Sequence, residues 1–110
     1  MARTLVSSGL QSPLGLAFDS GGILYVASQD DHTIERFTPE GVPLGTFADS
    51  GLNYPFGLAF DSVGNLYAAN VGDYTIQRFT PNGIGSLFAD TGNGNNPVFQ
   101  FFVVLIRSKL

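Results

Sequence analysis

The sequence predicts an all-β fold built from tandem repeats, and three observations lead to that prediction. First, residues 13–20, PLGLAFDS, return almost unchanged at 55–62 as PFGLAFDS, so that Pro55 follows Pro13 by 42 residues. Second, each copy holds several short apolar runs separated by turn signals of Gly, Pro, Asp and Asn. Third, the first runs of each copy are apolar on both faces, which is typical of a sheet that is covered on both sides. Self-similarity at this spacing indicates a repeat architecture.

The repeat extends beyond its opening motif. Leu-Tyr at 24–25 recurs at 66–67, Thr-Ile at 33–34 recurs at 75–76, and Arg-Phe-Thr-Pro at 36–39 recurs at 78–81. In the first copy we expect strands over 15–18, 23–27, 33–38 and 44–48. Residues 19–22 should join the first two strands as a tight hairpin, because Asp accepts hydrogen bonds from backbone amides and Gly adopts positive φ. Four antiparallel strands in about forty residues match one blade of a β-propeller.

Two sets of recurring residues are expected to pack neighbouring blades together. Alanines would let the sheets approach closely, and phenylalanines would fill the space as the blades splay outward. The alanines are Ala17, Ala27, Ala59 and Ala69, and the phenylalanines are Phe18, Phe37, Phe60 and Phe79.

The repeated pattern resembles a known family. Pro-x-Gly-Leu-Ala-Phe-Asp-Ser-x-Gly-x-Leu-Tyr-x-Ala, followed by Thr-Ile-x-Arg-Phe-Thr-Pro-x-Gly, is similar to the NHL-repeat β-propellers in their bacterial form. The resemblance covers roughly residues 5–97 and recurs in register. It implies a propeller, usually of about six blades. It does not imply one activity, because relatives include interaction scaffolds, lactonases and lyases.

The predicted fold is therefore an incomplete β-propeller of about two blades. Residues 1–12 would be the outer strand of a preceding blade plus a linker, 13–54 the first blade and 55–96 the second. Residues 97–110 read as a degenerate start of a third blade or an apolar tail, because the motif stops at Pro97.

Three explanations fit this interruption. The chain is a piece of a longer propeller, ended by truncation or a shifted reading frame; or it is an oligomer subunit; or the tail is a native strand that caps the exposed blade. The first is favoured, because the orphan strands at the two ends do not add up to a blade.

Composition excludes several classes of function. The net charge is −4 and only five residues are Lys or Arg, so no nucleic-acid surface is expected. There is no Cys, which excludes disulfides and thiolate metal sites. The longest apolar run, 98–106, is too short to span a bilayer as a helix. No signal peptide is recognised, and the C-terminal Ser-Lys-Leu is read as a coincidence with the peroxisomal address, so the compartment stays unknown.

Two acidic places in the sequence are candidates for chemistry. His32 lies beside Asp30 and Asp31, which could form a metal or acid–base site, but only the second Asp recurs in the other repeat, as Asp73. Asp19 and Asp61 could bind a cation at a propeller mouth, but their place in an Asp-Ser-x-Gly turn favours bonds to backbone amides.

The other recurring polar residues are also expected to serve the fold. Arg36 and Arg78 should lay their stems on the sheet with solvated heads. Tyr25 and Tyr67 should be core residues with the hydroxyl at the rim, and Thr33 and Thr75 should start strands. No catalytic, cofactor-binding or metal-binding residue, and no cofactor, is therefore predicted.

The predicted function is a non-enzymatic binding scaffold that presents its loops to a protein or carbohydrate partner. Further blades or self-association would cover its open faces. The alternatives are an inactive fragment of a propeller enzyme of the lactonase or lyase type, and a truncated or frameshifted gene product.

Overall fold

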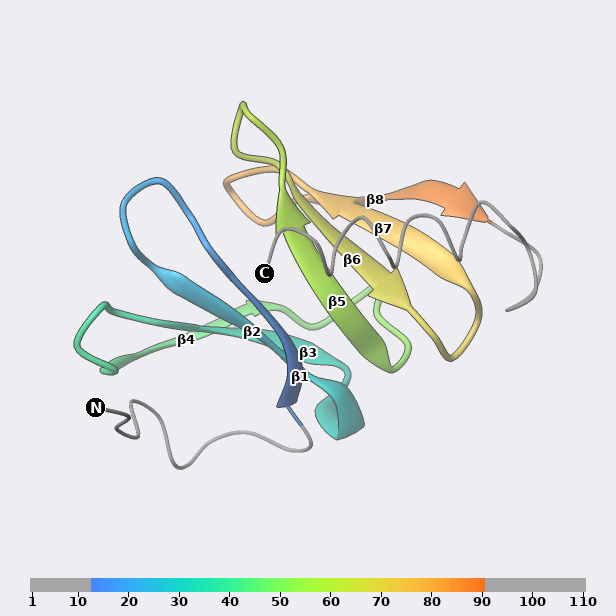
Figure 1. The fold of residues 1–110 in the computed structure, drawn as a ribbon. Helices are drawn as coiled ribbons and strands as arrows, with labels where there is room; N and C mark the ends of the chain where they lie inside the picture. Colours follow the sequence, from blue (N-terminus) through green and yellow to red (C-terminus); the bar gives the residue numbers. More distant parts are fainter. Residues whose placement is uncertain (1–12, 91–110) are drawn as a thin grey trace.

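The computed structural model describes residues 13–90, which form two four-stranded antiparallel sheets (Figure 1). The first sheet has the order β1-β2-β3-β4, and the second has the order β5-β6-β7-β8. The strands are β1 (Pro13–Phe18), β2 (Leu24–Ser28), β3 (Thr33–Phe37), β4 (Pro43–Ala48), β5 (Pro55–Phe60), β6 (Leu66–Asn70), β7 (Thr75–Phe79) and β8 (Gly85–Asp90), with a short 3-10 helix, η1 (Gln29–Asp31), between β2 and β3. The all-β prediction of tandem four-stranded sheets is confirmed, while the predicted segments 1–12 and 97–110 lie outside the described residues.

The outer hairpins, β3–β4 in the first sheet and β7–β8 in the second, close with the same type of turn. In the first sheet the Thr38 hydroxyl accepts a hydrogen bond from the Val42 backbone N–H at 3.0 Å, and the Thr38 carbonyl accepts one from Gly41 at 2.9 Å. Gly41 has φ +88°, a conformation that glycine adopts without steric cost. The second Thr-Pro-x-Gly repeats these bonds, so the motif acts as turn chemistry.

The two sheets pack through their first strands. β1 lies beside β5, and β5 also contacts β2 (Figure 1). At Gly15 the backbones of β1 and β5 come so close that a Cβ atom would overlap the Phe56 carbonyl oxygen and lie 2.9 Å from the Gly57 Cα. Only glycine fits such an approach.

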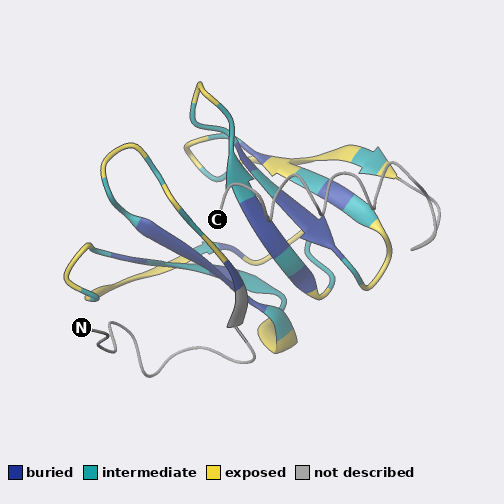
Figure 2. Ribbon diagram, viewed as in Figure 1, coloured by how far each residue is buried: buried dark blue, intermediate teal, exposed yellow. Residues whose placement is uncertain are grey.

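The space between the sheets is the main hydrophobic core. We call the side of each sheet that carries Phe18 or Phe60 its leading face, and the opposite side its trailing face. The trailing face of the first sheet meets the leading face of the second, and Figure 2 shows buried residues (dark blue) along β2, β5 and β6. The buried side chains are Tyr25, Ala27, Ile34 and Ala48 from the first sheet and Leu58, Leu66, Ala68 and Phe79 from the second.

One expected packing residue is not buried. Phe18 is 56% exposed, whereas its repeat counterpart Phe60 packs on the Tyr25 ring with the centroids 5.0 Å apart. The prediction that Phe18 fills a gap between blades is wrong, because among residues 13–90 no aromatic ring packs on Phe18 as Tyr25 packs on Phe60. Phe37 and Phe79 are only 2% and 1% exposed, as expected.

Among residues 13–90, no helix is both long and apolar enough to cross a membrane.

The close approach at Gly15 gives the first testable prediction. Gly15→Ala should lower the free energy of unfolding by about 1–3 kcal/mol, because the added methyl must push β1 away from β5. Gly21→Ala is the matched control, since a Cβ there meets only the Asp19 carboxylate, at an ordinary 3.5 Å. Urea denaturation measures both variants, and an equal loss of stability in the two would contradict this account of the sheet contact.

Candidate interaction surface

The recurring aspartates organise the hairpin turns at one end of the sheets. The Asp61 carboxylate accepts hydrogen bonds from the backbone N–H groups of Val63 at 3.0 Å and Asn65 at 2.9 Å. It also accepts bonds from the Asn65 side chain and the Tyr67 hydroxyl, both at 3.1 Å. Asp19 accepts from Gly21 and Ile23 in the same way. The turn role that the sequence predicted for these residues is confirmed.

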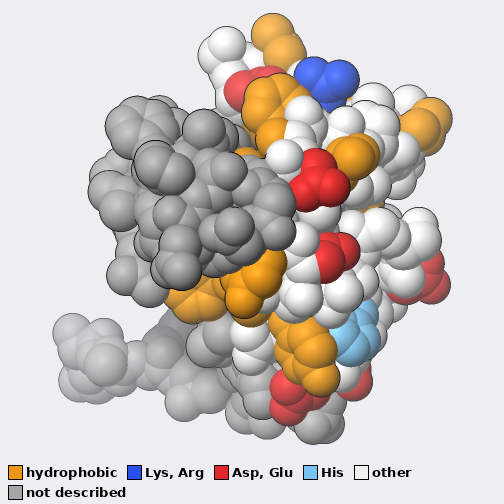
Figure 3. Space-filling model, turned by 90° about the vertical axis from the view of Figure 1, so that its right-hand side faces the viewer, with side chains coloured by type: hydrophobic (Ala, Val, Ile, Leu, Met, Phe, Trp, Pro, Cys, Tyr) orange, Lys and Arg blue, Asp and Glu red, His pale blue; other side chains and the backbone are white. Residues whose placement is uncertain are grey.

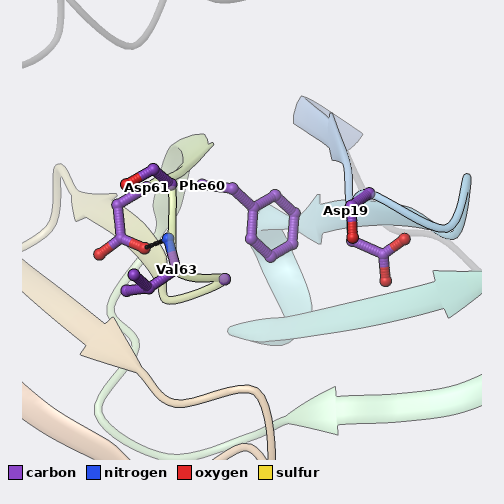
Figure 4. Close-up of a pocket in the computed structure, with 7 residues that line it drawn as sticks. Asp19, Phe60, Asp61 and Val63 are labelled. Carbon is purple, nitrogen blue, oxygen red and sulfur yellow. Dashed lines mark hydrogen bonds between the residues drawn. The ribbon is translucent and has the colours of Figure 1, made fainter.

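A pocket of about 250 Å³ lies between these two turns. Figure 4 shows Phe60 between Asp61 and Asp19, with the Asp61 carboxylate bonded to Val63. The lining residues are Asp19, Ser20, Phe60, Asp61, Ser62, Val63 and Gly64. Both carboxylates accept hydrogen bonds from backbone N–H groups of their own turns. The pocket is therefore a gap between the two turns.

Desolvation at the Asp61 turn opposes ionisation, but the hydrogen bonds it accepts favour the charged form more strongly. The backbone and side chain of Asn65, the backbone of Val63 and the Tyr67 hydroxyl together hold the pKa of Asp61 below its ordinary value of 3.8.

Tyr25 and Arg36 take part in the packing between the two sheets. Tyr25 is 5% exposed, and its ring meets Phe47 edge-on with the centroids 5.0 Å apart. The Arg36 guanidinium lies 5.5 Å from the Phe47 ring centroid and 5.9 Å from that of Tyr25. The head of Arg36 therefore rests on aromatic faces and is held by cation–π attraction, where the sequence had predicted a solvated head.

The opposite end of the sheets is made of three connected loops, which we call the loop end. It comprises the β2–β3 loop at 29–32, the β4–β5 linker at 49–54 and the β6–β7 loop at 71–74. The Tyr54 backbone joins all three, because its N–H donates to the His32 Nδ1 at 2.9 Å and its carbonyl accepts from Val71 at 3.1 Å. The Asn53 carbonyl accepts a further bond from Gly72 at 3.0 Å.

His32 therefore links the β2–β3 loop to the β4–β5 linker. Its ring also meets the Tyr54 ring edge-on, with the centroids 4.5 Å apart. The neighbouring Asp31 accepts a hydrogen bond from the Ser28 hydroxyl at 3.3 Å, which helps to hold the turn. Across residues 13–90, no group of three or more His, Asp or Glu side chains is placed to hold a metal ion.

Three aromatic residues at the loop end have a left-handed backbone. His32, Tyr54 and Tyr74 have φ of 56°, 49° and 59°, and they are the described non-glycine residues with positive φ. Such positions are strained, and they gather at binding sites more often than elsewhere. The side chains of Tyr54 and Tyr74 are 45% and 36% exposed. Figure 3 shows the histidine (pale blue) on a face that also carries hydrophobic (orange) and acidic (red) side chains.

Asn70 is a structural residue of the loop end that sequence reasoning missed. It ends β6, is fully buried, and its side-chain oxygen accepts from the Asn53 N–H at 3.1 Å. Its NH₂ group donates to the Gly51 carbonyl at 3.0 Å and to the Thr75 hydroxyl at 3.1 Å. One sign of its role is visible in the sequence, because this repeat position holds Ser28 in the first copy and Asn70 in the second.

Comparison with known proteins identifies the fold. The chain is similar to a chain in the crystal structure of a nidogen–laminin complex, with a TM-score of 0.66 and 26% identity over 74% of this chain and 32% of that one. It is also similar to virginiamycin B lyase from Staphylococcus aureus, with a TM-score of 0.59 and 18% identity over 77% of this chain and 28% of the lyase. The fold is that of part of a β-propeller.

The chain spans about a third of the length of the solved propeller chains it matches. No protein-family model matches the sequence, and no curated protein matches it. The likeness to the lyase shows the propeller fold alone.

The Asn70 network gives the second prediction. Asn70→Ala should lower the free energy of unfolding by about 1–3 kcal/mol, because the partly buried backbone groups of Gly51 and Asn53 lose their partner. Asn82→Ala in the exposed β7–β8 turn is the control and should change stability by less than about 0.5 kcal/mol. Thermal denaturation of both variants checks this, and an unchanged Asn70→Ala variant would contradict it.

The Asp61 turn gives a prediction about pH. Because the folded pKa lies below 3.8, the stabilisation from ionised Asp61 is fully present above that value and is lost as the pH falls through the folded pKa. Asp61→Asn should therefore melt at a lower temperature than the wild type near neutral pH, and the difference should shrink in acid below 3.8. A difference in melting temperature that stays constant into strong acid would argue against the carboxylate as its source.

Proposed function

We propose that this chain is a non-enzymatic segment of an NHL-type β-propeller that binds a protein partner through its loop end. The observation that supports this most directly is a pair of exposed tyrosines, Tyr54 in the hydrogen-bonded linker and Tyr74 in the β6–β7 loop that is bonded to it. Binding surfaces are commonly placed on loops that a rigid scaffold positions.

The NHL assignment rests on the repeated motif together with the fold. The Gly-Leu-Ala-Phe-Asp motif supplies the first strand and first turn of each sheet, and Arg-Phe-Thr-Pro supplies the end of the third strand and the outer turn. A non-enzymatic role is supported by the state of the polar side chains: Asp19 and Asp61 serve their turns, and the Nδ1 of His32 is occupied by the Tyr54 N–H.

The chemistry of the loop end favours a basic protein surface as its partner. Tyrosine supplies a large contact area at a low cost in side-chain entropy, and it is enriched among the residues that dominate binding energy. Asp30, Asp31 and Asp73 are exposed beside the tyrosines, and the whole chain has a net charge of −4. A partner that carries Arg or Lys would complement this charge.

A peptide library displayed on phage and selected on the immobilised chain tests this function. We expect the selected peptides to be rich in Arg and Lys, and their affinity to fall as the ionic strength rises. In the double variant Tyr54→Asn, Tyr74→Asn the dissociation constant should rise at least about tenfold, as measured by calorimetric titration. Asparagine is chosen because it tolerates the left-handed backbone of both positions.

The matched control is Val63→Asn, which removes an exposed hydrophobic side chain from the opposite end of the second sheet. Val63 is 75% exposed, and its loss should leave peptide affinity unchanged. Peptides that bind the double variant as well as the wild type would contradict the loop end as the binding surface. Binding on a glycan array without any peptide binding would point to a carbohydrate partner instead.

A further inference from the structure

The bond between His32 and the Tyr54 backbone depends on the protonation state of the imidazole. The Nδ1 atom of His32 accepts a hydrogen bond from the Tyr54 N–H at 2.9 Å. A ring nitrogen accepts only while it carries no proton, so the bond assigns the proton of the neutral ring to Nε2. When both ring nitrogens are protonated, both are donors. The Nδ1–H would then face another donor, the Tyr54 N–H, and the bond would be lost.

Two contacts hold the His32 ring against the linker. The His32 backbone ends the short helix η1, where its N–H donates to the Gln29 carbonyl at 3.2 Å and its φ is 56°. The His32 ring meets the Tyr54 ring edge-on, with an angle of 78° between the ring planes. The fold therefore places Nδ1 opposite the Tyr54 N–H, and protonation acts directly on this contact.

His32 is also the side chain of this protein that is suited to respond near neutral pH. The chain has one histidine and no cysteine. Histidine is the side chain that ordinarily changes its charge between about pH 5 and 8. Apart from a free α-amino group, no other group in the sequence ordinarily titrates in that range. A pH response of the folded chain in this range can therefore be assigned to one residue by substitution.

The other titratable side chains of the loop end are acidic or phenolic, and its three loops carry no Lys or Arg. They are Asp30, Asp31, Asp49, Asp73, Tyr54 and Tyr74. Aspartate and tyrosine ordinarily titrate at about pH 4 and about pH 10, outside the range of histidine. An imidazolium that forms among these carboxylates is attracted to them, and they offer it hydrogen-bond acceptors that the Tyr54 N–H cannot.

We propose that His32 is a pH-sensitive switch in the loop end: protonation of its ring breaks the bond to the Tyr54 N–H and releases the linker at 49–54 from the β2–β3 loop. The consequence for binding rests on the function proposed above. Because Tyr54 is part of that binding surface, a basic peptide should bind more weakly when His32 is protonated. The positive charge of the imidazolium acts in the same direction, since it repels Arg and Lys.

Nuclear magnetic resonance on the full chain tests the switch without any partner. At about pH 8 the His32 ring should be the Nε2–H tautomer, and the Tyr54 amide proton should have the downfield shift of a hydrogen-bonded group. As the pH falls to about 5, the ring signals and the Tyr54 amide should follow the same titration curve. A Tyr54 amide that stays unchanged while His32 titrates in the folded chain would overturn the proposal.

Two variants separate the switch from other effects of pH. His32→Asn places an Oδ1 atom where Nδ1 lies, tolerates the left-handed backbone and does not titrate, so its Tyr54 amide should keep the hydrogen-bonded shift throughout. His32→Gly tolerates the same backbone but has no acceptor, so its Tyr54 amide should keep the shift that the wild type reaches in acid. Circular dichroism checks that both variants are folded. A folded His32→Asn whose Tyr54 amide titrates like that of the wild type would contradict the proposal.

Calorimetric titration with an Arg-rich peptide that lacks histidine distinguishes the switch from the proposed function. From about pH 8 to about pH 5 the affinity of the wild type should fall about threefold to tenfold, as the loss of one hydrogen bond predicts, while that of His32→Asn should not depend on pH. An equal fall in both would overturn the control of binding by His32. If the Tyr54 amide titrates as expected but the chain binds no such peptide at either pH, the switch is supported and the proposed function is contradicted.

Discussion

The structure depends on one backbone contact, the approach of β1 to β5 at Gly15. A side chain at that position would overlap the Phe56 carbonyl, so the absence of a Cβ sets how closely the two sheets stack. The stacking then buries Ala27 and Ala68 completely and brings Phe60 onto Tyr25. A four-stranded sheet that is apolar on both faces cannot keep either face in water, so each sheet needs a neighbour at this distance.

The same contact determines the geometry of the loop end. With the sheets fixed, the linker at 49–54 has to cross from the outer strand β4 to the inner strand β5 over the ends of both sheets. Its backbone is then bonded on one side to His32 and on the other to Val71 and Asn70. Tyr54 has a left-handed backbone, with φ of 49°, at the point where it meets both sets of partners. The exposed tyrosine ring is therefore held by the scaffold, although it lies on a loop.

Short sequence motifs correctly predicted the turns, whose hydrogen bonds join residues close together in the chain. The turns followed from Asp-Ser-x-Gly and Thr-Pro-x-Gly, because each motif satisfies its own backbone groups within four residues. The burial of Phe18 could not be judged in this way, since it depends on what lies against the face rather than on the repeat. The bond between His32 and Tyr54 joins residues 22 apart in different loops, and no periodicity indicates it. The replacement of Ser28 by Asn70 between the repeats is visible in the sequence, but the hydrogen-bond partners of Asn70 could be found only from the folded structure.

The two repeats are alike at one end of the sheets and differ at the other. At the hairpin-turn end the repeats are alike, since Asp19 and Ser20 return as Asp61 and Ser62, and the Asp accepts the same backbone bonds in both copies. At the loop end they differ, with Ser28 replaced by Asn70 and His32 by Tyr74. Yet His32 and Tyr74 share one unusual backbone conformation, with φ of 56° and 59°. The two repeats therefore share the backbone conformation at this end and differ in the aromatic side chain, which agrees with the binding role that we propose for the loop end.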